Sequence, residues 1–336
     1  MVPAGTAAEA APAGACALSP TRNFLPGAPG WPLHQRPAGL ALTSPLPIVS
    51  KITTSSASVE TDIFYQDIGT GQPVVLIHGW PLSHRMWEPQ VNALTEAGYR
   101  CIAYDRRGFG ESDKPAGGYD YDTLAADLND LLTELDLRDV VLVGFSMGGG
   151  EVARYLSRYG TERVSKAVLV SSVTPFLGQT DGNPDGVPQH VFEGMLKDMT
   201  ADRAAFLQSF NKAFFNDGLL SHPVSQGQLD YAFQIGVMAQ PLATVECAKA
   251  FAGTDFRPDM AAFTVPTLIV HGDADQTVPI KASGDRAAEM IPSARYERIE
   301  GAPHGLYQTH TEAFNTLLLD FLGASGATAD PSEAQM

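Results

Sequence analysis

Short apolar runs alternate with helical patterns through the middle of the chain. Runs rich in Val, Ile and Leu predict buried strands at 73–79, 99–105, 139–145, 164–172 and 265–273. Continuous apolar runs are typical of a parallel sheet that is covered on both faces. Between two of them, Leu124, Leu128 and Leu131 recur at i, i+4 and i+7 and predict one apolar face of a helix. This alternation predicts an α/β fold with a doubly wound, mostly parallel sheet.

The alternation stops between residues 174 and 259. The loop sequence DGNPDGVP is followed there by helical patterns in which Phe206, Phe210 and Phe214 recur at i, i+4 and i+8. We therefore expect a helical cap at 174–259, inserted between core segments 52–173 and 260–322. The phenylalanines fit two interpretations, because they could pack the cap or line an apolar substrate pocket beneath it.

The two ends of the chain differ from the rest. Residues 1–51 are rich in Ala, Pro and Gly, and we expect them and the tail at 323–336 to be disordered. Such segments cannot bury enough apolar surface to offset the entropy lost on ordering. The first segment lacks the basic start and the apolar run of a signal peptide, and we hypothesise that the native start lies nearer Val49.

Composition narrows the classes of partner. The chain has 38 acidic and 22 basic residues among 336, a formal net charge of −16. So acidic a protein repels phosphate backbones and anionic lipid surfaces, so neither nucleic acid nor a membrane is an expected partner. Cys16, Cys101 and Cys247 are far apart and form neither a disulfide framework nor a metal-site pattern, which favours the cytoplasm. The oligomeric state, a homo-oligomer included, stays open.

The stretch 144–148 reads GFSMG, which matches the pattern G-x-S-x-G. The pattern alone is common, but here a predicted strand precedes it and a helical pattern follows it. In that context the serine sits in a strained turn that lifts its hydroxyl above the edge of the sheet. The amides that follow stand at a helix N-terminus, where they can bind an oxyanion. Ser146 is therefore the candidate nucleophile.

A serine hydroxyl needs a base that takes its proton, so an acid and a histidine are expected further along the chain. The sequence HGDADQTVP supplies Asp273 and Asp275 directly after a predicted strand. The sequence GAPHGL supplies His304 after a further predicted strand at 295–299. The order of serine, aspartate and histidine is the one that α/β hydrolases use.

Four motifs together resemble the α/β-hydrolase superfamily: HGWP at 78–81, YDRRGFGES at 104–112, GFSMGGG at 144–150 and HGDADQTVP at 271–279. More narrowly, they are similar to the cofactor-free bacterial haloperoxidases, also called non-haem chloroperoxidases or perhydrolase-type aryl esterases. The resemblance covers roughly residues 52–322.

The resemblance also implies roles for individual residues. It selects Asp275 over Asp273 as the triad acid, and it assigns the oxyanion hole to the backbone amides of Trp80 and Met147. It implies neither a metal nor an organic cofactor. We further expect the substrate pocket to be lined by Pro81, Val173 and Phe176.

The expected activity is acyl transfer on small carboxylic esters, with water or hydrogen peroxide as acceptor. Peroxide would give a peracid, which can oxidise halide in solution. Haloalkane dehalogenases and epoxide hydrolases are disfavoured, because they would carry aspartate at the position of Ser146. A lactonase or γ-lactamase with the same triad remains an alternative, a carbon–carbon bond hydrolase is a weaker one, and a non-catalytic ligand receptor on this scaffold is a third.

Overall fold

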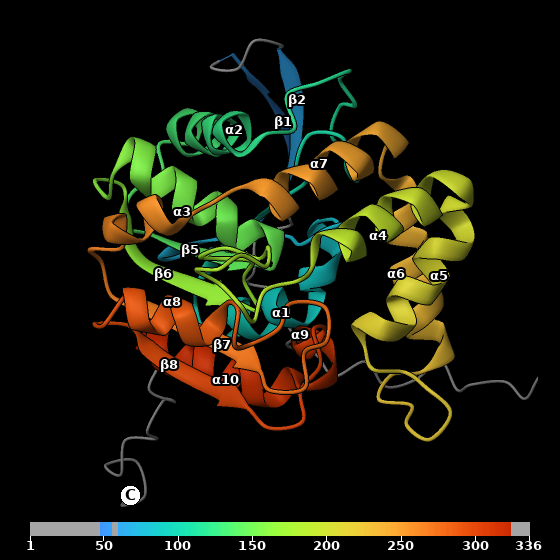
Figure 1. Ribbon diagram of the computed structural model, residues 1–336. Helices are drawn as coiled ribbons and strands as arrows, with labels where there is room; N and C mark the ends of the chain where they lie inside the picture. The colour runs from blue at the N-terminus through green and yellow to red at the C-terminus, as the bar shows by residue number, and fades with distance from the viewer. Residues whose placement is uncertain (1–47, 56–59, 324–336) are drawn as a thin grey trace, which may run out of the picture. The chain divides into compact units, whose positions relative to one another are not determined.

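The strands of the described chain form a single eight-stranded sheet (Figure 1). The computed structural model describes residues 48–55 and 60–323. The strand order is β1-β2-β4-β3-β5-β6-β7-β8. Pairs β1/β2 and β2/β4 are antiparallel and the other neighbours are parallel, so the expected mostly parallel sheet is confirmed. The strands are β1 (Ile48–Thr54), β2 (Thr61–Gly69), β3 (Pro73–Ile77), β4 (Arg100–Tyr104), β5 (Val140–Phe145), β6 (Val164–Val170), β7 (Thr267–Gly272) and β8 (Arg295–Ile299).

The hairpin of β1 and β2 corrects the expected boundary of the N-terminal extension. Residues 48–51 belong to β1, although composition assigns them to the disordered segment. Strand β1 lacks a continuous apolar run, because buried Ile52 and Thr54 alternate with exposed Lys51 and Thr53. The remainder of the expected extension and nearly all of the expected C-terminal tail lie outside the described residues.

Alternate residues of the central strands face two layers of helices. On β3, Val75 and Ile77 pack into one hydrophobic core. Val74 and Leu76 pack into the other. The first layer contains α2 (Tyr121–Glu134), α3 (Met147–Tyr159) and α8 (Gly284–Met290). The second contains the short 3-10 helix η1 (His84–Trp87) and helices α1 (Glu88–Glu96), α9 (Leu306–Thr309) and α10 (Thr311–Leu322).

Four α-helices lie between β6 and β7 in this continuous stretch of described chain, and we call them the cap helices. Figure 1 shows α4, α5 and α6 grouped beside the sheet. The side chains of Asp202 and Ser225 cap two of them by accepting hydrogen bonds from backbone amides three residues further on. The cap helices are α4 (Gln189–Ala201), α5 (Arg203–Phe214), α6 (Gln226–Met238) and α7 (Pro241–Gly253).

The expected end of the cap at residue 259 falls inside a 3-10 helix, η2 (Arg257–Ala262). This helix packs against α3 of the core, and Asp259 forms an ion pair with Arg154 of α3 at 3.2 Å. The chain therefore returns to the core before residue 259.

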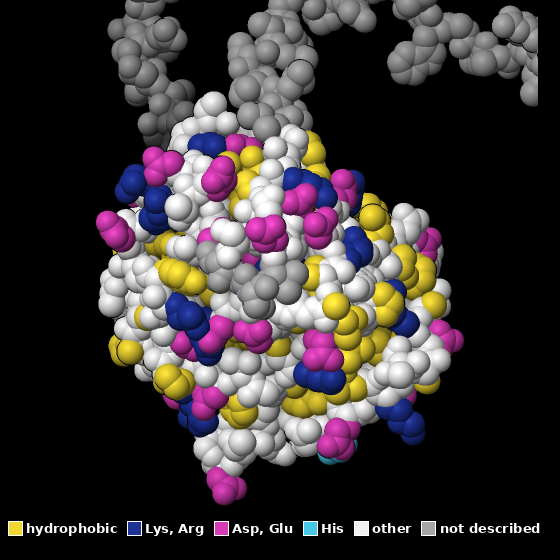
Figure 2. Space-filling view, turned by 90° about the horizontal axis from the view of Figure 1, so that it is seen from above, with side chains coloured by type: hydrophobic (Ala, Val, Ile, Leu, Met, Phe, Trp, Pro, Cys, Tyr) yellow, Lys and Arg dark blue, Asp and Glu magenta, His cyan; other side chains and the backbone are white. Residues whose placement is uncertain are grey.

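One face of the molecule carries charged side chains of both signs. On the face in Figure 2, Lys and Arg side chains stand next to Asp and Glu side chains. Among the described residues, no helix is long and apolar enough to cross a bilayer. The same residues hold no group of three or more His, Cys, Asp and Glu side chains suited to a metal ion.

Candidate active site

Ser146 occupies the turn between β5 and α3. Its φ of 53° is positive, and with a ψ of −117° the residue lies outside the ordinary strand and helix regions. Its amide donates to the Val170 carbonyl at 2.8 Å, and its carbonyl accepts from the Gly149 amide at 3.0 Å. These bonds hold the strained backbone that a nucleophile elbow requires, and they place the hydroxyl at the carboxyl end of β5.

Two glycines allow this turn to approach its neighbours. A Cβ on Gly148 would lie 2.5 Å from the Ile77 carbonyl oxygen, so a side chain there would push α3 away from β3. A Cβ on Gly79 would lie 2.5 Å from the Phe145 ring and 3.2 Å from the Ser146 Cβ. The loop that follows β3 therefore lies directly against the serine.

His304 reaches Ser146 from the loop between β8 and α9. Its Nε2 atom lies 2.9 Å from the Ser146 Oγ, within hydrogen-bond distance. The imidazole is 1 % exposed, and it packs against the rings of Phe145 and Phe214 with centroids 4.9 and 5.0 Å away. These two rings restrict the rotation of the imidazole, so that Nε2 stays directed at Ser146.

Asp275 follows β7 and contacts the other side of the imidazole. Its Oδ2 atom lies 2.7 Å from Nδ1 of His304, and its Oδ1 accepts the amides of Thr277 and Val278 at 2.9 and 2.8 Å. Burial alone would raise the pKa of Asp275, but the interactions with His304 and His271 outweigh it and hold that pKa well below the usual range. The carboxylate is therefore ionised and can orient His304.

Asp273, the other aspartate of the motif, has a different partner. Its Oδ1 accepts the Gly301 amide at 2.7 Å, and the residue is exposed. It braces a turn, whereas Asp275 contacts the histidine, which is the arrangement that the resemblance implies for these two residues.

His271 opens the HGDADQTVP motif and also contacts Asp275, although nothing in the motif marks it as a partner of that carboxylate. It lies on β7 with no exposed surface, and its Nε2 is 3.3 Å from the Asp275 Oδ2 and 2.9 Å from the Val278 carbonyl oxygen. Because a carbonyl only accepts, Nε2 carries the proton and is shared between these two oxygens. A buried histidine in a hydrophobic run is ordinarily a packing residue. The contact between His271 and Asp275 is therefore seen only in the structure.

The two amides expected to form the oxyanion hole belong to Met147, which follows Ser146, and to Trp80, which follows the glycine packed against Ser146. Met147 is the first residue of α3, so its amide is one of the N-terminal N–H groups without a partner inside the helix. Trp80 follows Gly79, the residue that lies against Ser146. The Trp80 side chain is 3 % exposed, and its Nε1 donates to the Thr244 carbonyl of α7 at 3.0 Å.

A buried ion pair between Arg106 and Glu151 stabilises the loop that contains His78 and Trp80. Arg106 donates from its guanidinium to the His78 carbonyl at 2.9 Å and to Glu151 of α3 at 2.8 Å. Its amide donates to the His78 Nε2 at 3.0 Å, so that nitrogen is unprotonated. Burial and the charge of Arg106 lower the pKa of His78 to about 3, which keeps the ring neutral. Arg106 and Arg107 are both at most 1 % exposed, and each forms a buried ion pair, with Glu151 and Asp127 respectively.

A cavity of about 250 Å³ is lined by both Ser146 and His304. Among the described residues that line it, none is Asp, Glu, Lys or Arg. Phe206 and Phe210 line it, whereas Phe214 packs against His304 instead, so the phenylalanines of α5 serve both the pocket and the packing. Its apolar lining also includes Trp80, Val173, Leu177, Phe192, Met195 and Phe251.

Two of the three expected pocket residues lie elsewhere, and this corrects the prediction. Val173 lines the cavity, but Pro81 and Phe176 do not. Pro81 is buried, and its ring lies near Gly236 of α6. Phe176 faces the guanidinium of Arg257 at 5.2 Å, because the loop after Val173 turns its ring toward η2.

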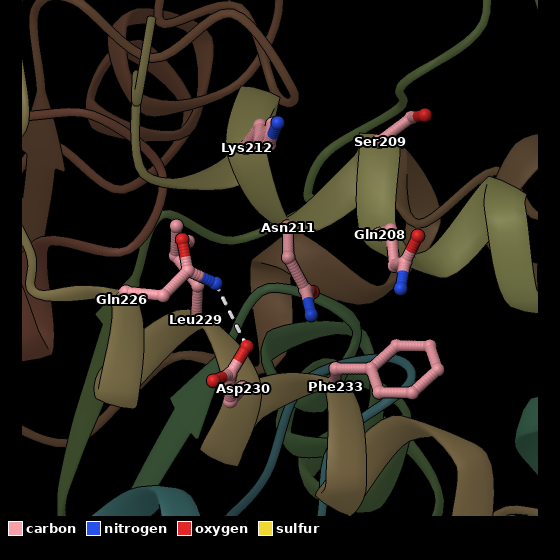
Figure 3. Close-up of a pocket in the computed structure, with 8 residues that line it drawn as sticks. All are labelled: Gln208, Ser209, Asn211, Lys212, Gln226, Leu229, Asp230 and Phe233. Atoms are coloured by element: carbon pink, nitrogen blue, oxygen red, sulfur yellow. Dashed lines mark hydrogen bonds between the residues drawn. The ribbon is translucent and has the colours of Figure 1, made fainter.

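A second cavity of about 300 Å³ lies between α5 and α6 (Figure 3). Its lining is polar, and Figure 3 shows the Gln226 amide reaching the Asp230 carboxylate, 2.8 Å apart. Ser146, Asp275 and His304 are all absent from its lining. The apolar cavity beside Ser146 is therefore the candidate active site.

Comparison with known proteins places the chain in a family. A family model described as the alpha/beta hydrolase fold matches residues 72–311. The chain belongs to the α/β-hydrolase family. Within this family, the chain is 48 % identical to the non-heme chloroperoxidase CPO-A1 of Kitasatospora aureofaciens over 274 residues, which cover 81 % of this chain and 98 % of that protein.

Two further relatives are named for esterase, perhydrolase or bromoperoxidase activity. It is 37 % identical to the bifunctional esterase/perhydrolase DCH of Acinetobacter calcoaceticus, over 78 % of this chain and 96 % of that protein. The crystal structure of a bromoperoxidase from Bacillus anthracis is 49 % identical and matches with a TM-score of 0.78, over 82 % of this chain and 100 % of that one. The expected branch of the family, the non-haem haloperoxidases, is confirmed.

Proposed function

We propose that this α/β hydrolase transfers acyl groups from small carboxylic esters to water, and from carboxylic acids or esters to hydrogen peroxide. One observation carries the proposal: the hydrogen-bonded series Ser146–His304–Asp275 borders an apolar cavity. The named activities of the haloperoxidase and perhydrolase relatives support the choice of acceptors.

Acylation starts at Ser146. Nε2 of His304 takes the hydroxyl proton while Oγ attacks the ester carbonyl, and Asp275 stabilises the imidazolium that forms. The amides of Trp80 and Met147 bind the oxyanion that develops on the carbonyl oxygen. His304 then gives its proton to the leaving alcohol, and an acyl-enzyme remains on Ser146.

Deacylation uses the same groups in reverse. His304 takes a proton from water or from hydrogen peroxide, and the resulting nucleophile attacks the acyl carbonyl. The bond between the acyl carbon and the Ser146 Oγ then breaks, and His304 returns the proton to Oγ. Water gives a carboxylic acid, whereas peroxide gives a peracid. The peracid leaves the cavity and can oxidise halide in solution, so no metal or cofactor is needed for any step in this scheme.

The cavity supports an uncharged, apolar acyl group as the substrate. Its lining carries no charged carboxylate, ammonium or guanidinium side chain among the described residues, so a charged acyl group would lose its hydration without gaining an ion pair. The buried free thiols of Cys101 and Cys247 support a reducing compartment such as the cytoplasm as the place of action.

An acyl-donor panel tests the function. p-Nitrophenyl esters of increasing chain length and a γ-lactone are offered to the full chain with water alone and with hydrogen peroxide, and both acid and peracid are measured. We expect Ser146→Ala to abolish both products, and Ser209→Ala, at an exposed serine of α5, to abolish neither. Peracid formation that survives in Ser146→Ala would reject a shared acyl-enzyme, and turnover of the lactone alone would favour a lactonase.

A further inference from the structure

Met195 shares the active-site cavity with Ser146. It lies on α4, where Val191, Phe192 and Met195 fall at i, i+1 and i+4, and all three line the cavity. Among the methionines of the described residues, it is the one in this lining. Met238 and Met290 are 51 % and 40 % exposed, and the other four, Met86, Met147, Met199 and Met260, are at most 3 % exposed.

We propose that Met195 is a modification site for the peracid that the enzyme itself makes. The inference rests on the proposed function, because the oxidant is its product. The O–O bond of the peracid breaks, its terminal oxygen bonds to the Met195 sulfur, and the remainder leaves as the carboxylic acid after taking up the peroxy proton. The thioether sulfur loses two electrons and becomes a sulfoxide, while the peroxide oxygens are reduced.

The cavity gives Met195 an advantage over every other described sulfur. A single peracid molecule confined in about 250 Å³ is at a local concentration of several molar, whereas Met238 and Met290 meet only peracid that has diffused into bulk solution. The buried thiols are poor competitors as well. Burial raises the pKa of Cys101 and of Cys247 to about 12, so both remain protonated, and the thiolate is the reactive form.

Oxidation at this position would alter the site that makes the oxidant. A sulfoxide is polar and chiral, and here it would stand in a lining that includes Leu177 and Phe192. An apolar acyl group would then be bound less well, so KM for the acyl donor rises more than kcat falls. The enzyme thus limits its own peracid output in proportion to the number of turnovers.

Site-resolved mass spectrometry of the enzyme during turnover tests this. The full chain is incubated with propionate and hydrogen peroxide, with and without excess free methionine, which captures peracid in bulk solution. We expect the sulfoxide at Met195 to form several-fold faster than at Met238 or Met290, and free methionine to protect the two exposed residues but not Met195. Equal protection of all three residues would show that the oxidant acts from bulk solution and would overturn the inference.

Three variants test whether the oxidation at Met195 depends on turnover and whether it causes the inactivation. Ser146→Ala with peroxide and propionate should leave Met195 unoxidised. Met195→Leu should inactivate several-fold more slowly than the wild type per molecule of peracid released, while Met238→Leu should inactivate as the wild type does. Peracid release without preferential oxidation of Met195 rejects this inference alone. An absence of peracid rejects the perhydrolase function and this inference with it.

Discussion

His271 and Asp275 contact each other behind the triad. Nε2 of His271 lies 3.3 Å from the Asp275 Oδ2, the same oxygen that lies 2.7 Å from His304. The catalytic carboxylate thus has a buried donor on the side away from the base. This position makes His271 a positioning residue, since it acts on His304 only through Asp275.

We expect His271→Asn to lower kcat about tenfold with little change in KM, because a charge-assisted hydrogen bond contributes about 1.5 kcal/mol and tenfold in rate corresponds to about 1.4 kcal/mol. Steady-state kinetics and thermal unfolding of the variant give the answer. His222→Asn, at an exposed histidine that pairs with Asp217, is the control and should match the wild type. A lower melting temperature with unchanged kcat would assign His271 a structural role alone.

The two aspartates of the HGDAD sequence should differ sharply. Asp275→Asn removes the carboxylate that orients His304, and loss of a triad aspartate costs on the order of 10⁴ in kcat. Asp273→Asn keeps an oxygen that can accept the Gly301 amide, so its kcat should stay within about threefold of the wild type. Steady-state assays of both variants on one ester decide between them, and comparable losses would contradict the assignment.

His78 should make the protein less stable in mild acid. Its pKa is lowered to about 3 in the folded protein, from about 6.5 in an unfolded chain. As the pH falls below 6.5, the unfolded chain takes up a proton that the folded protein does not, so stability declines by about 1.4 kcal/mol per pH unit until the pH nears 3.

Urea unfolding between pH 7 and pH 4 measures this slope. His78→Gln keeps an acceptor for the Arg106 amide but has no ionisable ring. Its unfolding should therefore take up about one proton fewer than that of the wild type, so its free energy of unfolding should fall less steeply as the pH is lowered. Parallel slopes for the two proteins would mean that His78 takes up its proton in the folded state as readily as in the unfolded chain.

Pro81 should affect the choice of acceptor. Proline offers no amide and restricts the residue before it, here Trp80, whose amide we assign to the oxyanion hole. We infer that Pro81 thereby sets the direction of the Trp80 carbonyl, which can accept a hydrogen bond from the attacking peroxide. We expect Pro81→Leu to lower the ratio of peracid formation to ester hydrolysis, measured with one acyl donor. An equal fall in both rates would leave Pro81 only the role of stiffening its loop.

The triad could be read from the sequence because each member has a local signature and a fixed order. Ser146 lies between a strand and a helix, and Asp275 and His304 each follow a strand, so strand ends alone bring them to one edge of the sheet. His271 and Arg106 have no such signature. Arg106 contacts Glu151, which is distant in the sequence, whereas His271 contacts Asp275, four residues further along, only through the conformation of the turn after β7.

The cavity was harder to predict than the triad. Its lining depends on the angle at which α4, α5 and α7 meet the core, and that angle follows from packing rather than from any motif. Val173 was predictable because it lies close to the end of β6, whereas Phe176 turns away toward η2 within a few residues. Similarly, the alternation of buried and exposed residues in β1 was not predicted, because the segment before it is rich in proline and was grouped with it.

The hydrogen bond from Trp80 to the Thr244 carbonyl has a consequence for protein engineering. The three triad residues lie outside the cap helices, so this insertion could be exchanged for that of a relative without altering a reacting atom. The grafted segment would have to place a carbonyl oxygen within hydrogen-bond distance of the Trp80 indole. Otherwise the buried indole N–H would lose its acceptor, and the protein would lose about 1–3 kcal/mol of stability. That backbone oxygen, together with a ring in the place of Phe214 of α5, which packs against His304, is what a new cap would have to supply around an unchanged catalytic base.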